Sequence, residues 1–174
     1  MLSNKVWMDG GSGMASRLQA ELKKKKPFDS PEQEAALGLL RTADLVQVRF
    51  ARLFRGHGLT PSQYNILRIL RGEGKPLPIL EIASRTITVV PGITGLIDRL
   101  EQAGFLARKR CEKDRRVVYV ELTTKGSRVL GELDQPLLEL HRNMLGHLSA
   151  TELGTLIGLL EKARSALAEG AGDA

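Results

Sequence analysis

The chain has 174 residues, of which 42% are hydrophobic and 26% are charged, and its net charge is +6. This length and composition predict one globular domain with a core of its own, and the basic balance suits a polyanionic partner. A single cysteine excludes an internal disulfide, and the absence of a signal peptide or of an apolar run near 18 residues favours a cytoplasmic protein without membrane contact.

The basic residues are concentrated in two segments. Residues 1–26 carry six Lys or Arg against two Asp or Glu, and residues 105–116 also carry six against two. Residues 27–104 are nearly balanced, and residues 117–174 are net acidic. A generic solvated surface would spread its charge, so the concentration at 105–116 indicates a surface that binds a polyanion.

Residues 1–29 are predicted to form a flexible basic arm, because their first part has no periodicity and contains Gly-Gly-Ser-Gly. Four consecutive lysines follow at Lys23–Lys26. They are either a solvated tether or an arm that adds phosphate contacts.

Residues 30–174 are predicted to fold as one unit that begins with a long helix over 30–57. Ser30, Pro31 and Gln33 form a capping box with proline in the first turn, and glycines near His57 end the helix. Its apolar stripe runs over about six turns and comprises Ala36, Leu39, Leu40, Ala43, Val46, Phe50, Leu53 and Phe54.

The segment 59–124 contains two short helices, a turn, a third helix and a hairpin. Thr60 to Gln63 repeat the capping box, with Leu59 and Tyr64 placed to pack as a hydrophobic staple, and Gly72 or Gly74 ends this helix. A strand at 75–77 and a brief helix at 78–85 are expected next. This spacing is typical of a helix-turn-helix.

The third helix and the hairpin form the basic part of this segment. Apolar residues at helical spacing, Ile93, Leu96, Ile97 and Leu100, precede a glycine stop at 104. Alternating runs at 105–111 and 117–122 predict strands joined by a polar tip. A groove-sized helix beside a basic hairpin predicts a winged helix, mainly α with a small β wing, in which the helix enters the major groove of DNA.

The C-terminal residues 125–168 are predicted to be two more helices. Thr123 or Thr124 caps the first, Pro136 should kink or divide it, and a capping box from Ser149 to Glu152 starts the second. The apolar faces of 30–57 and 125–168 pack either on one another within a single chain or, as we favour, on a second copy of this chain. A two-fold dimer would set two recognition helices about 34 Å apart over a pseudo-palindromic operator.

These motifs resemble the MarR family of winged-helix regulators over about residues 32–168. The family's wing pattern, Asp-x-Arg, five residues, Leu-Thr, two residues and Gly, is complete at Asp114, Arg116, Leu122, Thr123 and Gly126. The run from Thr94 to Glu101 with Gly104, and the run from Leu59 to Tyr64, also match. The resemblance implies a homodimeric, sequence-specific DNA-binding transcriptional regulator, most often a repressor, relieved by a small aromatic or phenolic effector.

Three positions depart from the family's usual pattern. Gly92 and Gly95 lie where members often carry polar side chains, so fewer side chains would reach base edges. Pro78 lies where many members have a Ser or Thr cap.

The wing supplies the first group of candidate DNA contacts. The resemblance implies that Arg116 enters the minor groove and that Asp114 braces it, and narrow A·T grooves attract arginine. A tip ion pair without function is the less favoured alternative. Candidate phosphate partners are Arg108, Lys109, Arg110, Lys113 and Arg115. Alternation along a strand means that not all can face DNA; about four per subunit would give a log–log salt slope near −7.

The front of the recognition helix supplies the second group, which should meet bases or sugars: Thr88, Pro91, Gly92, Thr94 and Gly95. Arg99 could contact phosphate or pair with a carboxylate, with equal weight. Asp98 is expected to be structural, because phosphate repels a carboxylate.

No enzyme site, cofactor site or metal site is expected. The sequence has no Ser/His/Asp order, no glycine-rich phosphate loop and no set of His or Cys at metal-ligand spacing. Cys111 has no second cysteine to resolve an oxidised form. The alternative function is a winged-helix protein-interaction module that binds no operator, which the basic hairpin disfavours.

Overall fold

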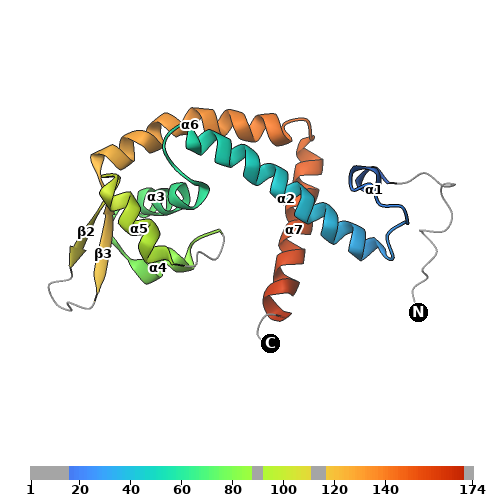
Figure 1. The fold of residues 1–174 in the computed structure, drawn as a ribbon, viewed down its shortest axis with the longest axis horizontal. Coiled ribbons are helices and arrows are strands. Elements are labelled where there is room, and N and C mark those ends of the chain that lie inside the picture. Colours follow the sequence, from blue (N-terminus) through green and yellow to red (C-terminus); the bar gives the residue numbers. More distant parts are fainter. Residues whose placement is uncertain (1–15, 88–91, 111–116, 171–174) are drawn as a thin grey trace. The chain divides into compact units, whose positions relative to one another are not determined.

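The computed structural model describes residues 16–87, 92–110 and 117–170 (Figure 1). These residues belong to two compact units, one up to Val46 and one from Gln47 onwards, and helix α2 contributes to both. In chain order the elements are α1 (Arg17–Glu21), α2 (Pro31–Arg55), α3 (Pro61–Glu73), β1 (Leu77–Pro78), α4 (Ile79–Ser84), α5 (Ile93–Gln102), β2 (Leu106–Arg110), β3 (Val118–Leu122), α6 (Thr124–Leu145) and α7 (Ala150–Gly170). The predicted class, mainly helical with a small antiparallel sheet, is confirmed.

The first unit contains a helix that the sequence pattern does not predict. Five residues form α1, and its N-cap Ser16 accepts a hydrogen bond from the backbone N–H of Gln19 at 3.2 Å. Helix α2 begins where predicted, with Ser30 Oγ accepting from Gln33 N–H at 3.2 Å. The Gln33 side chain, however, accepts from the N–H of Asp29 at 2.8 Å and not from that of Ser30.

The start of α3 confirms its predicted capping box. The Thr60 hydroxyl accepts from the N–H of Gln63 at 3.3 Å, and the Gln63 side chain accepts from the N–H of Thr60 at 2.9 Å. Leu59 and Tyr64, the predicted staple pair, are both buried. The helix ends at Gly74 with φ +68°, the left-handed conformation that glycine adopts without strain.

The hairpin forms as predicted, and β1 extends it to a three-stranded antiparallel sheet in the order β1-β3-β2. Leu106 pairs with Leu122 and Arg108 with Val120, while Leu77 of β1 also pairs with Val120. The first strand was expected at 75–77 and lies at Leu77–Pro78. Pairing with β3 decides its position, and a local pattern cannot report that contact.

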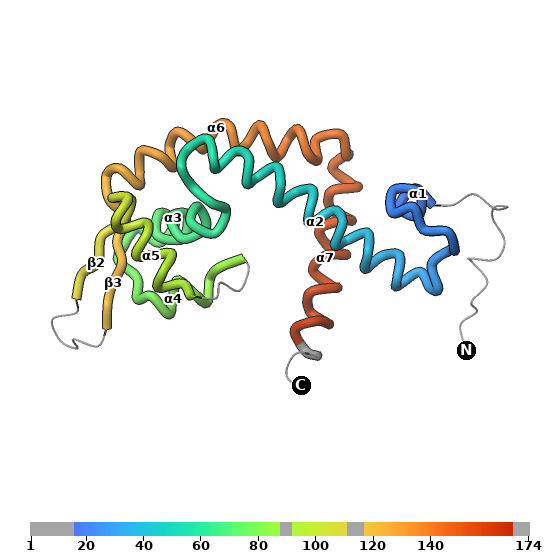
Figure 2. Tube along the Cα trace, viewed as in Figure 1, coloured from blue at the N-terminus to red at the C-terminus, as the bar shows by residue number. Residues whose placement is uncertain are grey.

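The core lies between α3, α4, α5, the sheet and the start of α6, which Figure 2 shows gathered at one end of the second unit. Phe54 of α2 stacks on Tyr64 of α3 with ring centroids 4.2 Å apart, and Phe50 stacks on Phe54 at 5.9 Å. The largest fully buried side chains are Ile66, Leu67, Leu77, Ile82, Ile97, Leu100, Leu106, Leu130, Leu133 and Val120. Helix α5 and the wing strands β2 and β3 lie at the edge of this core.

The two C-terminal helices differ sharply in burial. Helix α6 passes through Pro136 as one element, so of the two predicted effects of this proline, a kink or a division, the division does not occur. Three of its side chains, Val129, Leu130 and Leu133, enter the core. Helix α7 starts at the predicted capping box, but its described side chains include none that is buried. Its apolar side chains, such as Leu153, Leu156 and Leu160, are therefore at most partly covered within the described residues.

Candidate nucleic-acid interface

Helix α5 presents its first turn to solvent because its other face is held in the core. Ile97 and Leu100 are fully buried, whereas Gly92 and Thr94 are exposed. Gly92 is the N-cap with φ +71°, a left-handed conformation that disfavours any residue with a Cβ. This backbone requirement explains one of the glycines that depart from the family pattern, and the backbone at that point can approach a ligand closely.

The described residues contain seven of the thirteen candidate contacts. Gly92, Thr94, Gly95 and Arg99 lie on or beside α5, and Arg108, Lys109 and Arg110 lie on β2. The remaining six lie outside the described residues: Thr88, Pro91, Lys113, Asp114, Arg115 and Arg116. The structure therefore places the helix and the base of the wing side by side and leaves the predicted tip contacts untested.

The cations of β2 fall into two kinds. Lys109 and Arg110 are exposed, and within the described residues no carboxylate lies at ion-pair distance from either of them. Arg108 is different, because its side chain is only 24% exposed and its guanidinium meets two carboxylates of α5. Nη2 lies 2.5 Å from Asp98 Oδ1, and Nη1 donates to Glu101 Oε2 at 2.7 Å.

The strand register explains the partial burial of Arg108. It lies on the same face of β2 as buried Leu106 and directly opposite buried Val120. Desolvation lowers its pKa, but the hydrogen bonds and charges of Asp98 and Glu101 outweigh that effect, so the pKa of the Arg108 guanidinium is raised. Asp98 is thus a structural carboxylate, as predicted, while Arg99 is exposed and has no described ion-pair partner.

The residues of the Leu-Thr-x-x-Gly pattern join the wing to α6. Thr123 Oγ1 accepts from the N–H of Gly126 at 3.1 Å as the N-cap, and its hydroxyl donates to the carbonyl of Gly104 at 2.7 Å. Lys125 Nζ donates to the carbonyl of Ala103 at 2.7 Å. These bonds attach the start of α6 to the turn between α5 and β2, which explains the spacing of the pattern physically.

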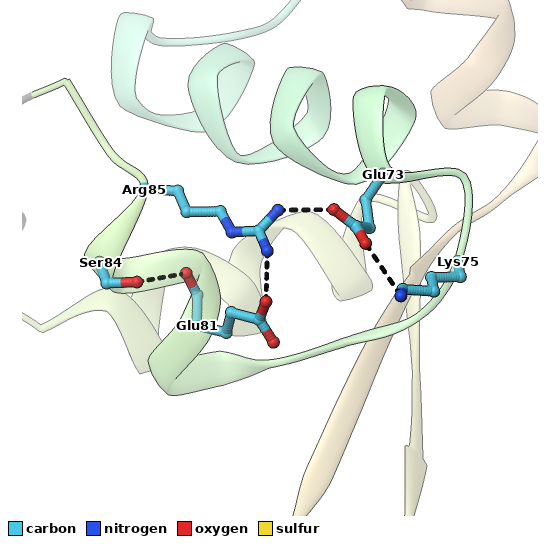
Figure 3. A network of polar contacts seen from close by, with 5 residues as sticks. All are labelled: Glu73, Lys75, Glu81, Ser84 and Arg85. Carbon is cyan, nitrogen blue, oxygen red and sulfur yellow. Dashed lines mark hydrogen bonds and ion pairs between the residues drawn. The ribbon is translucent and has the colours of Figure 1, made fainter.

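A surface ion-pair network braces α3 against α4 (Figure 3). The Arg85 guanidinium donates to Glu73 at 2.6 Å and also bonds Glu81, and Lys75 lies 3.1 Å from Glu73. Hydrogen bonds from Arg85 and Lys75 hold the pKa of the Glu73 carboxyl below its ordinary value of 4.5. The network fixes the helix that precedes the turn into α5.

The described residues form neither a membrane-spanning helix nor a metal-binding cluster. None of the described helices is long and apolar enough to cross a membrane. Within the same ranges, no three His, Cys, Asp or Glu side chains cluster so as to hold a metal ion. The polar groups that stand out are thus those of α5 and the wing.

Comparison with known proteins agrees with this geometry. Residues 59–118 match the MarR family. The transcriptional regulator YkoM of Bacillus subtilis, itself described as uncharacterized, is 36% identical over 149 residues, which span 78% of this chain and 90% of that protein.

The chain is a member of the MarR family. The crystal structure of a MarR transcription factor from Planctomyces limnophilus is 43% identical, with a TM-score of 0.61 over 77% of this chain and 98% of that one. A cysteine-to-serine mutant of MarR from Escherichia coli, solved with operator DNA, is 25% identical, with a TM-score of 0.67 over 78% and 99% of the two chains. Membership makes this protein a DNA-binding transcriptional regulator built on a winged helix.

Proposed function

We propose that this MarR-family regulator acts as a homodimeric repressor on a pseudo-palindromic operator. The observation that carries the dimer is the exposure of large apolar side chains on α7, where Ile157, Leu159 and Leu167 are 56%, 61% and 70% exposed. Leu138 and Leu145 of α6 are also exposed. An isologous contact between two copies would bury such side chains.

The dimer is tested with a charge placed among these exposed apolar side chains of α7. Leu159→Arg should dissociate the dimer in sedimentation and weaken binding to a two-half-site operator far more than to a single half-site. Ser165→Arg is the control, because it adds the same charge on an exposed polar position of the same helix. A wild-type chain that sediments as a monomer at micromolar concentration would refute the proposal.

In the proposed complex, the first turn of α5 enters the major groove and the wing follows the adjacent backbone. The exposure of Thr94, Lys109 and Arg110 supports this docking. Arg116 is assigned to the minor groove with Asp114 as its brace, and Lys113 and Arg115 to phosphates. Reversing the charge of both Arg115 and Arg116 should abolish the operator shift in a gel and leave the dimer intact. Unchanged operator affinity would favour the protein-interaction alternative.

The effector is proposed from family membership: a small aromatic or phenolic compound that shifts the two recognition helices out of register with the groove. A panel of simple benzoates and phenols should contain a compound that releases operator DNA and raises the Tm of the free protein. A regulator that works on chromosomal DNA is proposed to reside in the cytoplasm. No catalytic step is part of this function.

The N-terminal lysines are proposed to add phosphate contacts. Lys24 is held within its own segment, since its ammonium donates to the carbonyls of Lys26 and Pro27 at 3.0 and 2.5 Å. The side chains of Lys23, Lys25 and Lys26 are exposed. Changing these three to Gln should make the salt slope shallower by up to about 5 units in the dimer, whereas Lys24→Gln should barely change it. An unchanged slope in the triple variant would leave the segment a solvated tether.

A further inference from the structure

Arg108 belongs to the basic segment 105–116, yet its surroundings differ from those of an exposed cation. Glu101 accepts two bonds from this one residue: Oε1 from the Arg108 backbone N–H at 3.1 Å and Oε2 from Nη1 at 2.7 Å. Asp98 meets Nη2, which also lies 3.4 Å from the carbonyl of Thr94. Both the main chain and the side chain of β2 are therefore attached to α5 at this point.

The charge balance of this cluster argues against a phosphate contact. Two carboxylates surround one guanidinium, so the cluster is net negative, and both terminal nitrogens of Arg108 already have carboxylate partners. A phosphate would have to displace charge-assisted hydrogen bonds and approach two like charges. The neighbouring Lys109 is exposed and meets no such obstacle.

We propose that Arg108, with Asp98 and Glu101, is a positioning residue that locks the recognition helix to the wing, and that it does not contact DNA. This inference rests on the DNA-binding function of the chain. The α5 helix and the wing approach different parts of the duplex, so their mutual geometry decides whether both can bind at once. A cross-link between α5 and β2 removes the freedom that binding would otherwise have to restrict.

The direction in which one substitution changes the affinity for DNA separates a phosphate contact from a positioning role. If Arg108 contacts phosphate, Glu101→Gln removes a competing negative charge and should tighten DNA binding. If the cluster positions α5, Glu101→Gln should weaken binding by about fivefold per protomer, although the protein becomes less negative. Glu121→Gln is the matched control, because it removes an exposed carboxylate of β3 that has no ion-pair partner among the described residues.

The experiment measures operator affinity at several salt concentrations for the full-length dimer, with sedimentation and Tm as checks of folding. Glu101→Gln should bind more weakly than wild type, with Glu121→Gln equal or tighter. Arg108→Gln should weaken binding without the loss of about 2 units of salt slope that two phosphate contacts per dimer would give. If Glu101→Gln does not fold, Asp98→Asn replaces it, since it leaves the bonds from Glu101 in place.

Tighter binding by Glu101→Gln or Asp98→Asn, or loss of that slope in Arg108→Gln, would overturn the inference. A wild-type dimer that binds no duplex DNA would instead refute the function on which the inference rests. The two failures are therefore distinguishable in the same titration.

Discussion

Replacement of Gly126 by alanine tests how tightly the wing is joined to α6. A Cβ at this position would lie 2.1 Å from the carbonyl oxygen of Phe105 and 2.7 Å from Leu122 Cδ1. Because the oxygen of Phe105 belongs to the backbone, either the turn before β2 or the first turn of α6 would have to move. We expect an overpacking cost of about 3 kcal/mol, offset by about 1 kcal/mol of better helix propensity.

The net destabilisation of Gly126→Ala, about 2 kcal/mol, corresponds to a fall in Tm of about 4 to 8 °C for a chain of this size. Gly131→Ala is the control, since Gly131 is an exposed residue of the same helix and a Cβ there would meet nothing within 4 Å. It should raise stability by about 0.5–1 kcal/mol. Thermal and urea unfolding at one protein concentration measure both. If Gly126→Ala proved as stable as Gly131→Ala, or more stable, the argument from the close contact with Phe105 would be refuted.

Three further changes test the surrounding contacts. Thr123→Val should cost about 1–2 kcal/mol in urea unfolding, because it removes the N-cap of α6 and one bond to the preceding turn. Glu73→Gln should destabilise the protein at pH 7 and progressively less below pH 4.5. The reason is that a carboxyl whose pKa is lowered by folding stabilises the fold above its unfolded pKa. That stabilisation is lost as the pH falls through the folded pKa. A double-mutant cycle on Arg71 and Asp134, which join α3 to α6 through bonds of 3.0 and 2.8 Å, should give a coupling of about 0.5–1 kcal/mol; none would mean that solvent screens the pair fully.

The helices and the hairpin were predictable because they depend on local signals. Thr60 and Ser149 cap their helices through bonds to residues three positions away, which do not depend on the rest of the fold. The alternating runs of the wing form paired strands as predicted. Helix α1 escaped prediction because five residues are too few to show a helical period. Pro136 left α6 in one piece, although a proline inside a helix predicts a kink or a division.

The sequence predicts a candidate interface on α5 and the wing, but it does not give each residue's surroundings. Positive charge alone grouped Arg108 with Lys109 as a phosphate partner, whereas the fold turns Arg108 toward the two carboxylates of α5. The alternation that buries Leu106 also places Arg108 on that inner face, and Asp98 and Glu101 are three residues apart on one helix, so both signals were present. Their meeting depends on how α5 packs on β2, which no local pattern specifies.

The two outer strands of the small sheet have a bearing on how this protein behaves at high concentration. On one side the backbone amide of Arg108 is already occupied by Glu101. On the other, β1 is two residues long and one of them is Pro78, which has no amide hydrogen. An extended segment of a neighbouring molecule would therefore lack a backbone donor at Arg108 and at Pro78, which disfavours the addition of a further strand at these two positions.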